Sequence, residues 1–112
     1  MRDTYEWPRP DESESYHRIT EILGCKWSLA IFDSLADGPK RPAQIEKLHD
    51  GLTARVLHRC LTRLQQDGII SRKTFDELSP HVEYSLTERG RDLVKVLGSI
   101  RAITKGWPMG TH

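Results

Sequence analysis

The apolar positions of the chain repeat every three or four residues over several stretches, which is the spacing of one face of a helix. The first stretch covers residues 12–36, and Gly24 is a candidate break that would divide it into two helices. A short helix is expected over residues 42–49, with Ile45 and Leu48 facing inward. The pattern therefore predicts a helical N-terminal half.

The segment GLTARVLHRCLTRLQQDGI, residues 51–69, predicts a helix with two distinct faces. Thr53 is a suitable N-cap, because its hydroxyl can accept a hydrogen bond from a backbone amide one turn later, and the helix is expected to run over residues 53–67. At about 100° per residue, the apolar side chains gather on one side: Val56, Leu57, Cys60, Leu61 and Leu64. The polar side chains gather on the other: Arg55, His58, Arg59, Thr62, Arg63 and Gln66.

The last third of the chain predicts a hairpin followed by a helix. Residues 69–75 and 82–86 have the composition of strands, and the segment between them is the tip of the hairpin. Thr87 then caps a helix that runs to about residue 105. The apolar stripe of this helix is Leu93, Val94, Leu97, Ile100 and Ile103. The order helix, helix, turn, helix, hairpin, helix predicts a mostly α fold with a small β-hairpin (α+β), the winged helix-turn-helix.

Length and composition limit the class of protein further. The 112 residues are enough for one domain, expected over residues 12–105 between flexible tails at 1–11 and 106–112. No apolar run approaches the roughly 20 residues of a membrane span, and the acidic N-terminus does not resemble a secretory signal. Cys25 and Cys60 lack the spacing of a zinc site or a disulfide framework. We therefore expect a cytoplasmic protein with reduced thiols and no cofactor.

Catalysis is not expected from this sequence. It contains no nucleophile elbow, no phosphate-binding glycine loop and no Ser/His/Asp or Cys/His arrangement that the predicted elements would bring together. The five histidines show no paired metal spacing. Trp27 and Tyr16 are expected to pack in the core, and the alternative is that they line a pocket for a small-molecule effector.

Charge is distributed unevenly along the chain. The net charge is only +1, but residues 38–73 carry eight Lys/Arg against three Asp/Glu, whereas residues 1–23 carry three against six. An exposed helix stabilised by its own side chains would intersperse acids with its arginines. Residues 53–66 contain no acid. The three arginines of this helix therefore repel one another unless an anion lies across their face.

Double-stranded DNA is the anion that suits a helix-turn-helix, because the second helix (here residues 53–67, the recognition helix) enters the major groove with its N-terminal residues against base edges. The side chains expected at base edges are Thr53, Ala54, Arg55, His58 and Arg59. Those expected at the DNA backbone include side chains of the hairpin, residues 69–86, which forms the wing: Lys40, Arg41, Arg63, Arg72, Lys73 and His81. Two alternatives remain, a plain solvated face and a winged-helix module that binds an acidic protein instead of DNA.

Several segments together resemble one known family. LGCKWSLAIFDSL, DGIISRK and VEYSLTERG, in this order, are similar to HxlR-type winged helix-turn-helix transcriptional regulators, a bacterial and archaeal group related to MarR. The resemblance covers roughly residues 16–105. It implies a homodimer that pairs through its first and last helices, places two recognition helices in adjacent major grooves and binds a rough palindrome.

Three positions depart from the family pattern. Cys25 stands where relatives usually have a second glycine, Pro42 where they usually have an aromatic residue, and His81 where the wing usually offers an arginine, so that a contact from His81 would be weaker and pH-sensitive. Some relatives sense oxidants through a cysteine nearer the N-terminus, where this chain has none. Cys25 is the candidate replacement, because the neighbouring Lys26 would lower its pKa, although a packing cysteine is the simpler interpretation. Cys60 is expected to be an inert core residue.

Overall fold

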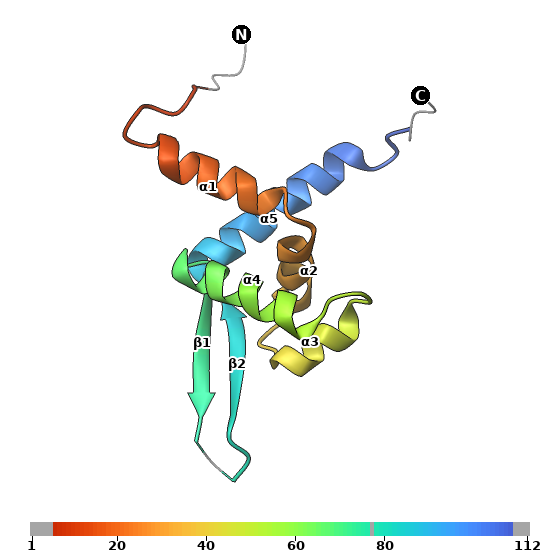
Figure 1. Ribbon diagram of the computed structural model, residues 1–112. Helices are drawn as coiled ribbons and strands as arrows, with labels where there is room; N and C mark the ends of the chain where they lie inside the picture. Colours follow the sequence, from red (N-terminus) through yellow and green to blue (C-terminus); the bar gives the residue numbers. More distant parts are fainter. Residues whose placement is uncertain (1–5, 77, 109–112) are drawn as a thin grey trace.

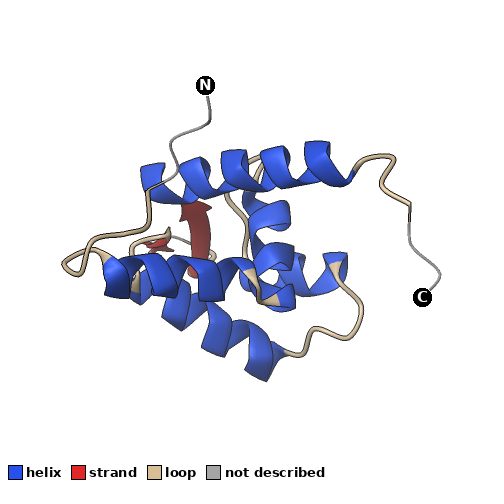
Figure 2. Cartoon of the chain, turned by 90° about the horizontal axis from the view of Figure 1, so that it is seen from above, coloured by secondary structure: helices blue, strands red, loops and turns tan. Residues whose placement is uncertain are grey.

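The computed structural model describes residues 6–76 and 78–108, and helices make up most of this part of the chain (Figure 1, Figure 2). The elements are α1 (Ser13–Leu23), α2 (Lys26–Leu35), α3 (Pro42–Leu48), α4 (Ala54–Gln66), β1 (Ile70–Phe75), β2 (His81–Leu86) and α5 (Glu88–Thr104). Strands β1 and β2 pair as an antiparallel hairpin. The predicted mostly α architecture with a small hairpin, the winged helix-turn-helix, is confirmed.

The first helical pattern divides at Gly24, the break that the sequence suggested. The amide of Gly24 closes α1 by donating hydrogen bonds to the carbonyl oxygens of Thr20 and Glu21. Cys25 then has an extended backbone, with φ −100° and ψ 117°, and is the N-cap of α2. As a result, α2 leaves α1 at a steep angle (Figure 1).

Every helix and both strands contribute to one apolar core. Its buried side chains are Ile22, Ile31, Phe32, Leu35, Ile45, Leu52, Leu57, Leu61, Leu64, Ile69, Ile70, Tyr84 and Leu93. Burying a side chain of this size stabilises the fold by about 1.5–3 kcal/mol. The prediction that Leu48 faces inward is wrong, because this side chain is 58% exposed. Leu48 is the last residue of α3, and Leu52 in the following turn is buried instead.

Two threonines cap the helices as predicted. The Thr53 hydroxyl oxygen accepts a hydrogen bond from the amide of Val56 at 3.2 Å, which begins α4. The Thr87 hydroxyl oxygen accepts from the amide of Gly90 at 3.2 Å, which begins α5. The Thr87 hydroxyl also donates to the carbonyl oxygen of Gly68 at 2.6 Å. Thr87 therefore both starts α5 and ties it to the connection between α4 and β1.

The backbone of Lys40 anchors the hairpin to the helices. Its amide donates to the carbonyl oxygen of Tyr84 at 3.0 Å, and the amide of Tyr84 donates back at 2.8 Å. Lys40 thus forms an isolated bridge beside β2, a pairing that the sequence pattern did not predict. Beyond this anchor the hairpin projects from the helical part of the molecule (Figure 1).

A buried hydroxyl links α2 to the end of α3. Ser34, which is 3% exposed, donates from its hydroxyl to the carbonyl oxygen of Ala30 at 2.9 Å and lies 2.9 Å from Nε2 of His49. Since the hydroxyl proton is engaged by Ala30, we assign His49 Nε2 as the donor of the second hydrogen bond.

Removing this hydroxyl is expected to destabilise the fold. Ser34→Ala should lower the free energy of unfolding by about 1 kcal/mol, because the hydrogen bond to His49 is lost inside the protein. Urea unfolding followed by circular dichroism measures the change. Ser99→Ala is the matched control, since Ser99 is exposed and bonds only within its own helix. Equal changes in the two variants would contradict a structural role for the Ser34 hydroxyl.

The C-terminal half of α5 extends away from the other helices and carries apolar side chains on its surface (Figure 1). Val96 and Ile100 are each 44% exposed, and Ile103 is 65% exposed. The predicted stripe of α5 is therefore buried within the chain at Leu93 and exposed towards the end of the helix. Among residues 6–76 and 78–108, none of the helices has the length and apolar content needed to cross a membrane.

Candidate nucleic-acid interface

The five residues predicted to face base edges lie on the exposed face of the cap and first two turns of α4. Leu57, Leu61 and Leu64 hold the opposite face in the core, each with no more than 2% of its surface exposed. The exposed positions are Thr53, Ala54, Arg55, His58 and Arg59. The burial pattern confirms the predicted division of α4 into an apolar face and a polar face.

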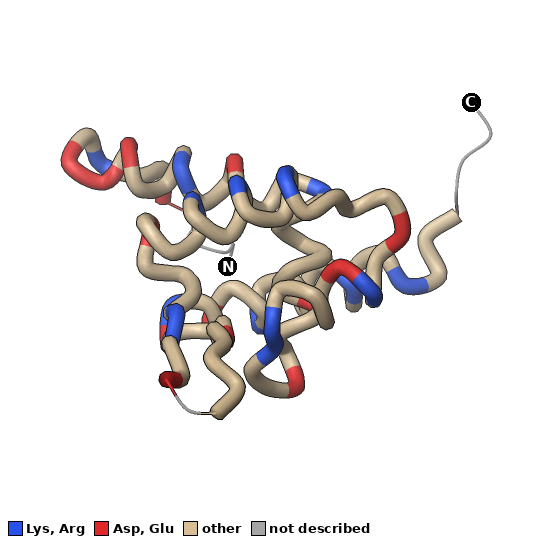
Figure 3. The backbone as a smooth tube through the Cα atoms, turned by 60° about the horizontal axis from the view of Figure 1, so that its bottom comes forward, with Lys and Arg blue, Asp and Glu red and all other residues tan. Residues whose placement is uncertain are grey.

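Acidic and basic positions both occur in most parts of the chain (Figure 3), although residues 53–66 contain no acid. The basic side chains best suited to bind an external anion are therefore those that form no ion pair within the chain. In the described part of the chain, residues 6–76 and 78–108, neither Arg55 nor Arg59 forms an ion pair. Both guanidinium groups project from an exposed helix face and are free to bind an external anion.

Arg63, one turn farther along α4, is in a different position. Its guanidinium forms an ion pair with Glu21 of α1, so its charge is already balanced within the chain. The sequence analysis considered acids only on the helix that carries Arg63, so it did not reveal this ion pair with Glu21. A contact between Arg63 and a DNA phosphate remains a prediction, and it would require Arg63 to leave Glu21.

The two basic residues before α3 differ in their exposure and in their ion pairing. The ammonium of Lys40 is paired with Asp37 at 2.6 Å, and this contact lowers the pKa of the Asp37 carboxyl. Only 20% of the Lys40 side chain is exposed. Arg41 is exposed, and its backbone amide donates to the side-chain oxygen of Gln44 at 2.7 Å. Arg41 is therefore the better placed of the two to meet a DNA strand.

On the wing, Arg72 and Lys73 are exposed on β1, and the Lys73 ammonium lies 5.0 Å from the centre of the Phe75 ring. The His81 ring also stacks on the Phe75 ring, with the two ring centres 4.7 Å apart. Both ring nitrogens of His81 contact the hairpin itself, at the Ser79 carbonyl oxygen and the Glu83 carboxylate. Its side chain is thus engaged in holding the tip of the wing.

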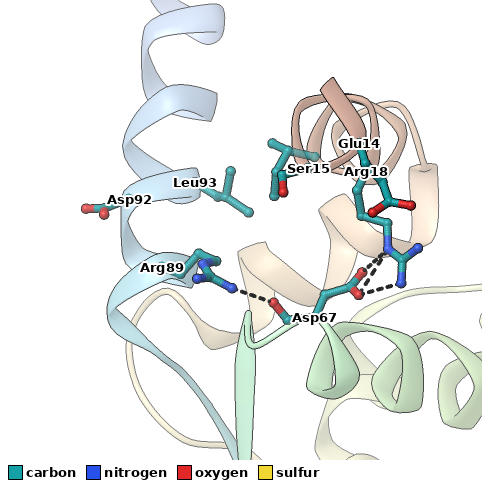
Figure 4. Close-up of a pocket in the computed structure, with 8 residues that line it drawn as sticks. Glu14, Ser15, Arg18, Asp67, Arg89, Asp92 and Leu93 are labelled. Carbon is teal, nitrogen blue, oxygen red and sulfur yellow. Dashed lines mark hydrogen bonds and ion pairs between the residues drawn. The ribbon is translucent and has the colours of Figure 1, made fainter. Parts of the chain in front are cut away.

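A cavity of about 620 Å³ lies between α1, the end of α4 and α5 (Figure 4). It is lined by Glu14, Ser15, Arg18, Ile19, Asp67, Arg89, Asp92 and Leu93. Arg18 donates to both carboxylate oxygens of Asp67 at 3.1 Å, which raises the pKa of Arg18. Because 49 positions separate these residues, spacing along the sequence did not reveal their contact.

The sequence offered one alternative role for Trp27 and Tyr16, as the lining of a pocket for a small-molecule effector. Neither side chain lines this cavity. Tyr16 borders a second hollow beside α1, and Trp27 lines neither of the two. Trp27 is half-buried against the core, with the Lys26 ammonium 4.7 Å from its ring centre. These contacts agree with the expected packing role of Trp27.

The thiol of Cys25 lies at the N-terminus of α2. Hydrogen bonds from the side chain and backbone of Ser28 lower the pKa of Cys25, and the positive charge of Arg63 adds a smaller effect in the same direction. The sequence suggested a lowered pKa but attributed it to Lys26. The main cause is instead the side chain of Ser28, one turn farther along α2, and its backbone adds to the effect.

Comparison with known proteins agrees with this geometry. The model of the HxlR-like helix-turn-helix family matches residues 22–111. Two HTH-type transcriptional regulators of Bacillus subtilis, both of uncharacterised role, are similar in sequence. YdeP is 42% identical over 77 residues, which are 69% of this chain and 60% of YdeP, and YtcD is 35% identical over 88 residues, which are 79% of this chain and 70% of YtcD.

A solved structure is similar over nearly the whole fold. The structure of a regulator assigned to the MarR family from Enterococcus faecalis V583 matches with a TM-score of 0.79 and 32% sequence identity. The match covers 92% of this chain and 94% of that one. The present chain spans only 60% of the length of YdeP, so the activity of such a relative as a whole is not carried over.

Proposed function

The chain belongs to the HxlR-like family of helix-turn-helix transcriptional regulators, and we propose that it binds double-stranded DNA as a homodimer at a rough palindrome. In this proposal α4 is the recognition helix and the β1–β2 hairpin is the wing. The observation that carries it is the exposed, acid-free face at the start of α4, where Arg55 and Arg59 lack ion-pair partners in the described chain.

Arg55 and Arg59 are the proposed readers of the bases. An arginine can donate two hydrogen bonds to O6 and N7 of guanine, which distinguishes guanine from the other bases in the major groove. The two side chains lie four positions apart, so they project from successive turns of the same helix face. Thr53, Ala54 and His58 border them on this face and would contact neighbouring base edges or thymine methyl groups.

The DNA backbone would be held on both sides of the recognition helix. Arg41 approaches from the start of α3, and Arg72 and Lys73 approach from the wing, all three exposed. These contacts supply affinity and orientation rather than sequence discrimination. Lys40 and Arg63 were expected to share this role, and each would first have to exchange its carboxylate partner for a phosphate.

The apolar end of α5 supports the homodimer. Val96, Ile100 and Ile103 expose apolar surface on the half of α5 that projects from the fold. A contiguous patch of this kind on a single chain commonly marks a protein interface. Pairing two copies through α5, with α1 beside it, would set two recognition helices on one side of DNA. Their half-sites would then be centred about 10 base pairs, or a multiple of this, apart.

Selection from a randomised DNA pool at physiological salt tests the proposal directly. The bound fraction should yield a palindromic motif with half-sites one or more helical turns apart. Affinity for this motif should fall linearly on a log–log plot against salt concentration, because bound phosphates release counterions. If no motif is enriched, the proposal of sequence-specific binding fails, and the alternative of a protein-interaction module is favoured.

Two single substitutions test the assignment of the reading residues. Arg55→Ala and Arg59→Ala should each weaken binding to the selected motif by about 1–3 kcal/mol and relax the base preference at one position. Fluorescence anisotropy with the motif and its single-base variants measures both effects. Lys95→Ala is the control, since it also removes one positive charge but lies on α5. Unchanged base preference in both arginine variants would contradict the assignment.

A further inference from the structure

The C-terminal end of α4 is bonded to both α1 and α5 through one residue, Asp67 (Figure 4). Nε of Arg18, on α1, donates to both carboxylate oxygens of Asp67 at 3.1 Å, and a second nitrogen of the same guanidinium lies 3.0 Å from one of these oxygens. Arg89, on α5, donates to the backbone carbonyl oxygen of Asp67 at 2.9 Å. Asp67 is therefore the point at which side chains from two other helices hold α4.

The backbone at Asp67 is fixed by the way α4 ends. Asp67 is the C-cap of the helix, and Gly68 follows it with a positive φ of 73°. The amide of Gly68 donates back to the carbonyl oxygen of Gln65 at 3.0 Å. The amide of Ile69 donates to the carbonyl oxygen of Leu64 at 2.9 Å, which completes a common glycine-dependent helix ending. A displacement of Asp67 therefore moves the end of α4 with it.

Charge strengthens both contacts with Asp67. The Asp67 side chain is only 10% exposed, so its carboxylate depends on Arg18 for a counter-charge. Arg89 lies at the C-terminus of α4, where the helix dipole places partial negative charge on the last carbonyl oxygens. Both arginines are therefore held at Asp67 by their charge as well as by their hydrogen bonds.

A cavity beside these contacts leaves α4 room to tilt. This cavity, of about 620 Å³, lies between α1, the end of α4 and α5, and it is lined by Arg18, Asp67 and Arg89 among others. Helices α1 and α4 also meet at the ion pair between Glu21 and Arg63, but a contact of Arg63 with a DNA phosphate would break this pair. On DNA, the angle between α1 and α4 would then depend more strongly on the ion pair of Arg18 with Asp67.

We propose that Asp67 is a positioning residue, which fixes the angle of α4 relative to α1 and α5 and so determines the half-site separation that the homodimer accepts on DNA. This inference rests on the proposed function, in which α1 and α5 form the dimer and α4 reads the bases. One base pair more or less between the half-sites moves the second half-site by about 3.4 Å and turns it by about 35° around the duplex axis. Rigidly held recognition helices cannot follow this change, whereas helices that are free to tilt tolerate it.

Two variants each release α4 from one of the dimer helices. Arg18→Ala/Asp67→Asn removes the ion pair with α1 without leaving an unpaired carboxylate, and Arg89→Ala removes the hydrogen bond from α5. Lys95→Ala is the matched control for Arg89→Ala, because it also removes one positive charge from α5 but pairs with Asp92 instead of Asp67. Circular dichroism establishes that each variant is folded, and either of the two releasing variants suffices for the test.

Fluorescence anisotropy with a series of DNA duplexes measures the effect. The duplexes carry the two half-sites of the selected motif at its own separation and at one base pair more or less. The unsubstituted protein and Lys95→Ala should lose about tenfold in affinity at the altered separations, and the releasing variants about threefold or less, because only a dimer that can adjust still binds both half-sites at once. Arg18→Lys, which keeps the positive charge opposite Asp67, should behave as the unsubstituted protein does.

The ratio of affinities between two separations is the decisive quantity, because a variant that is merely less stable loses active protein equally for every duplex. Base preference within a half-site should stay the same in all variants, since α4 carries the same side chains. If the releasing variants keep the ratio of the unsubstituted protein, or if that protein itself accepts all separations equally, Asp67 does not position α4 and the inference is wrong. Failure of the proposed function is distinguishable, because the unsubstituted protein would then select no palindromic motif.

Discussion

Glutamate in place of both Ile100 and Ile103 is expected to give a folded monomer with greatly reduced affinity for a palindromic DNA site. The two side chains are 44% and 65% exposed on the end of α5, outside the core cluster of the chain. Charging them should therefore leave the fold of one chain intact. In the dimer, however, the four carboxylates would be brought together in an apolar contact, where burial of unpaired charge is costly.

The loss of DNA affinity should exceed the effect of any single base contact. A dimer binds the second half-site as an intramolecular event, and this linkage increases affinity by about 100-fold or more. Analytical ultracentrifugation measures the change of mass in solution, and anisotropy measures binding to the full palindrome.

A single substitution on the same helix provides the control for the dimer experiment. Lys95→Glu also adds an acid to an exposed position of α5, but outside the line formed by Ile100 and Ile103. It should remain dimeric. If the double variant keeps the mass of a dimer, then α5 does not form the interface, and the proposed arrangement of the two recognition helices is wrong.

Gly90→Ala should have the largest effect on stability, about 3 kcal/mol in the free energy of unfolding. A Cβ atom at Gly90 would lie 2.3 Å from the carbonyl oxygen of Ile69 and 3.0 Å from a methyl carbon of Leu86. The Ile69 oxygen cannot move aside easily, because it accepts a hydrogen bond from the amide of Thr87 at 3.0 Å. The added methyl group would push α5 away from the base of the hairpin.

Gly98→Ala, on the same helix, should have the opposite effect. Apart from its chain neighbours and the backbone of its own helix, no heavy atom lies within 4 Å of a Cβ built at Gly98, so alanine fits without displacement. Alanine should stabilise this helix position by about 0.5–1 kcal/mol, because glycine loses more backbone freedom on folding. Thermal and urea unfolding of the two variants measure both changes. Similar changes in stability at the two positions would contradict the close approach of α5 to Ile69.

Local patterns in the sequence predicted the features of the candidate interface that depend on one helix at a time. The period of 3.6 residues placed Leu57, Leu61 and Leu64 opposite Arg55 and Arg59, and burial in the structure agrees. The caps at the starts of α4 and α5 were predicted for the same reason, since a capping hydroxyl and its amide lie within three positions. Each of these features depends only on neighbours along the chain.

Contacts between helices were decided by the tertiary structure alone. Glu21 forms an ion pair with Arg63 across 42 positions, a separation that no helical or strand period would indicate. The exposure of Leu48 was also decided by the tertiary structure. The turn that follows α3 places Leu52, and not Leu48, in the core. The sequence by itself determined which face of α4 is polar. Only the packing of α1 beside α4 decided which charges on that face remain available, because side chains from distant segments become neighbours when the helices pack together.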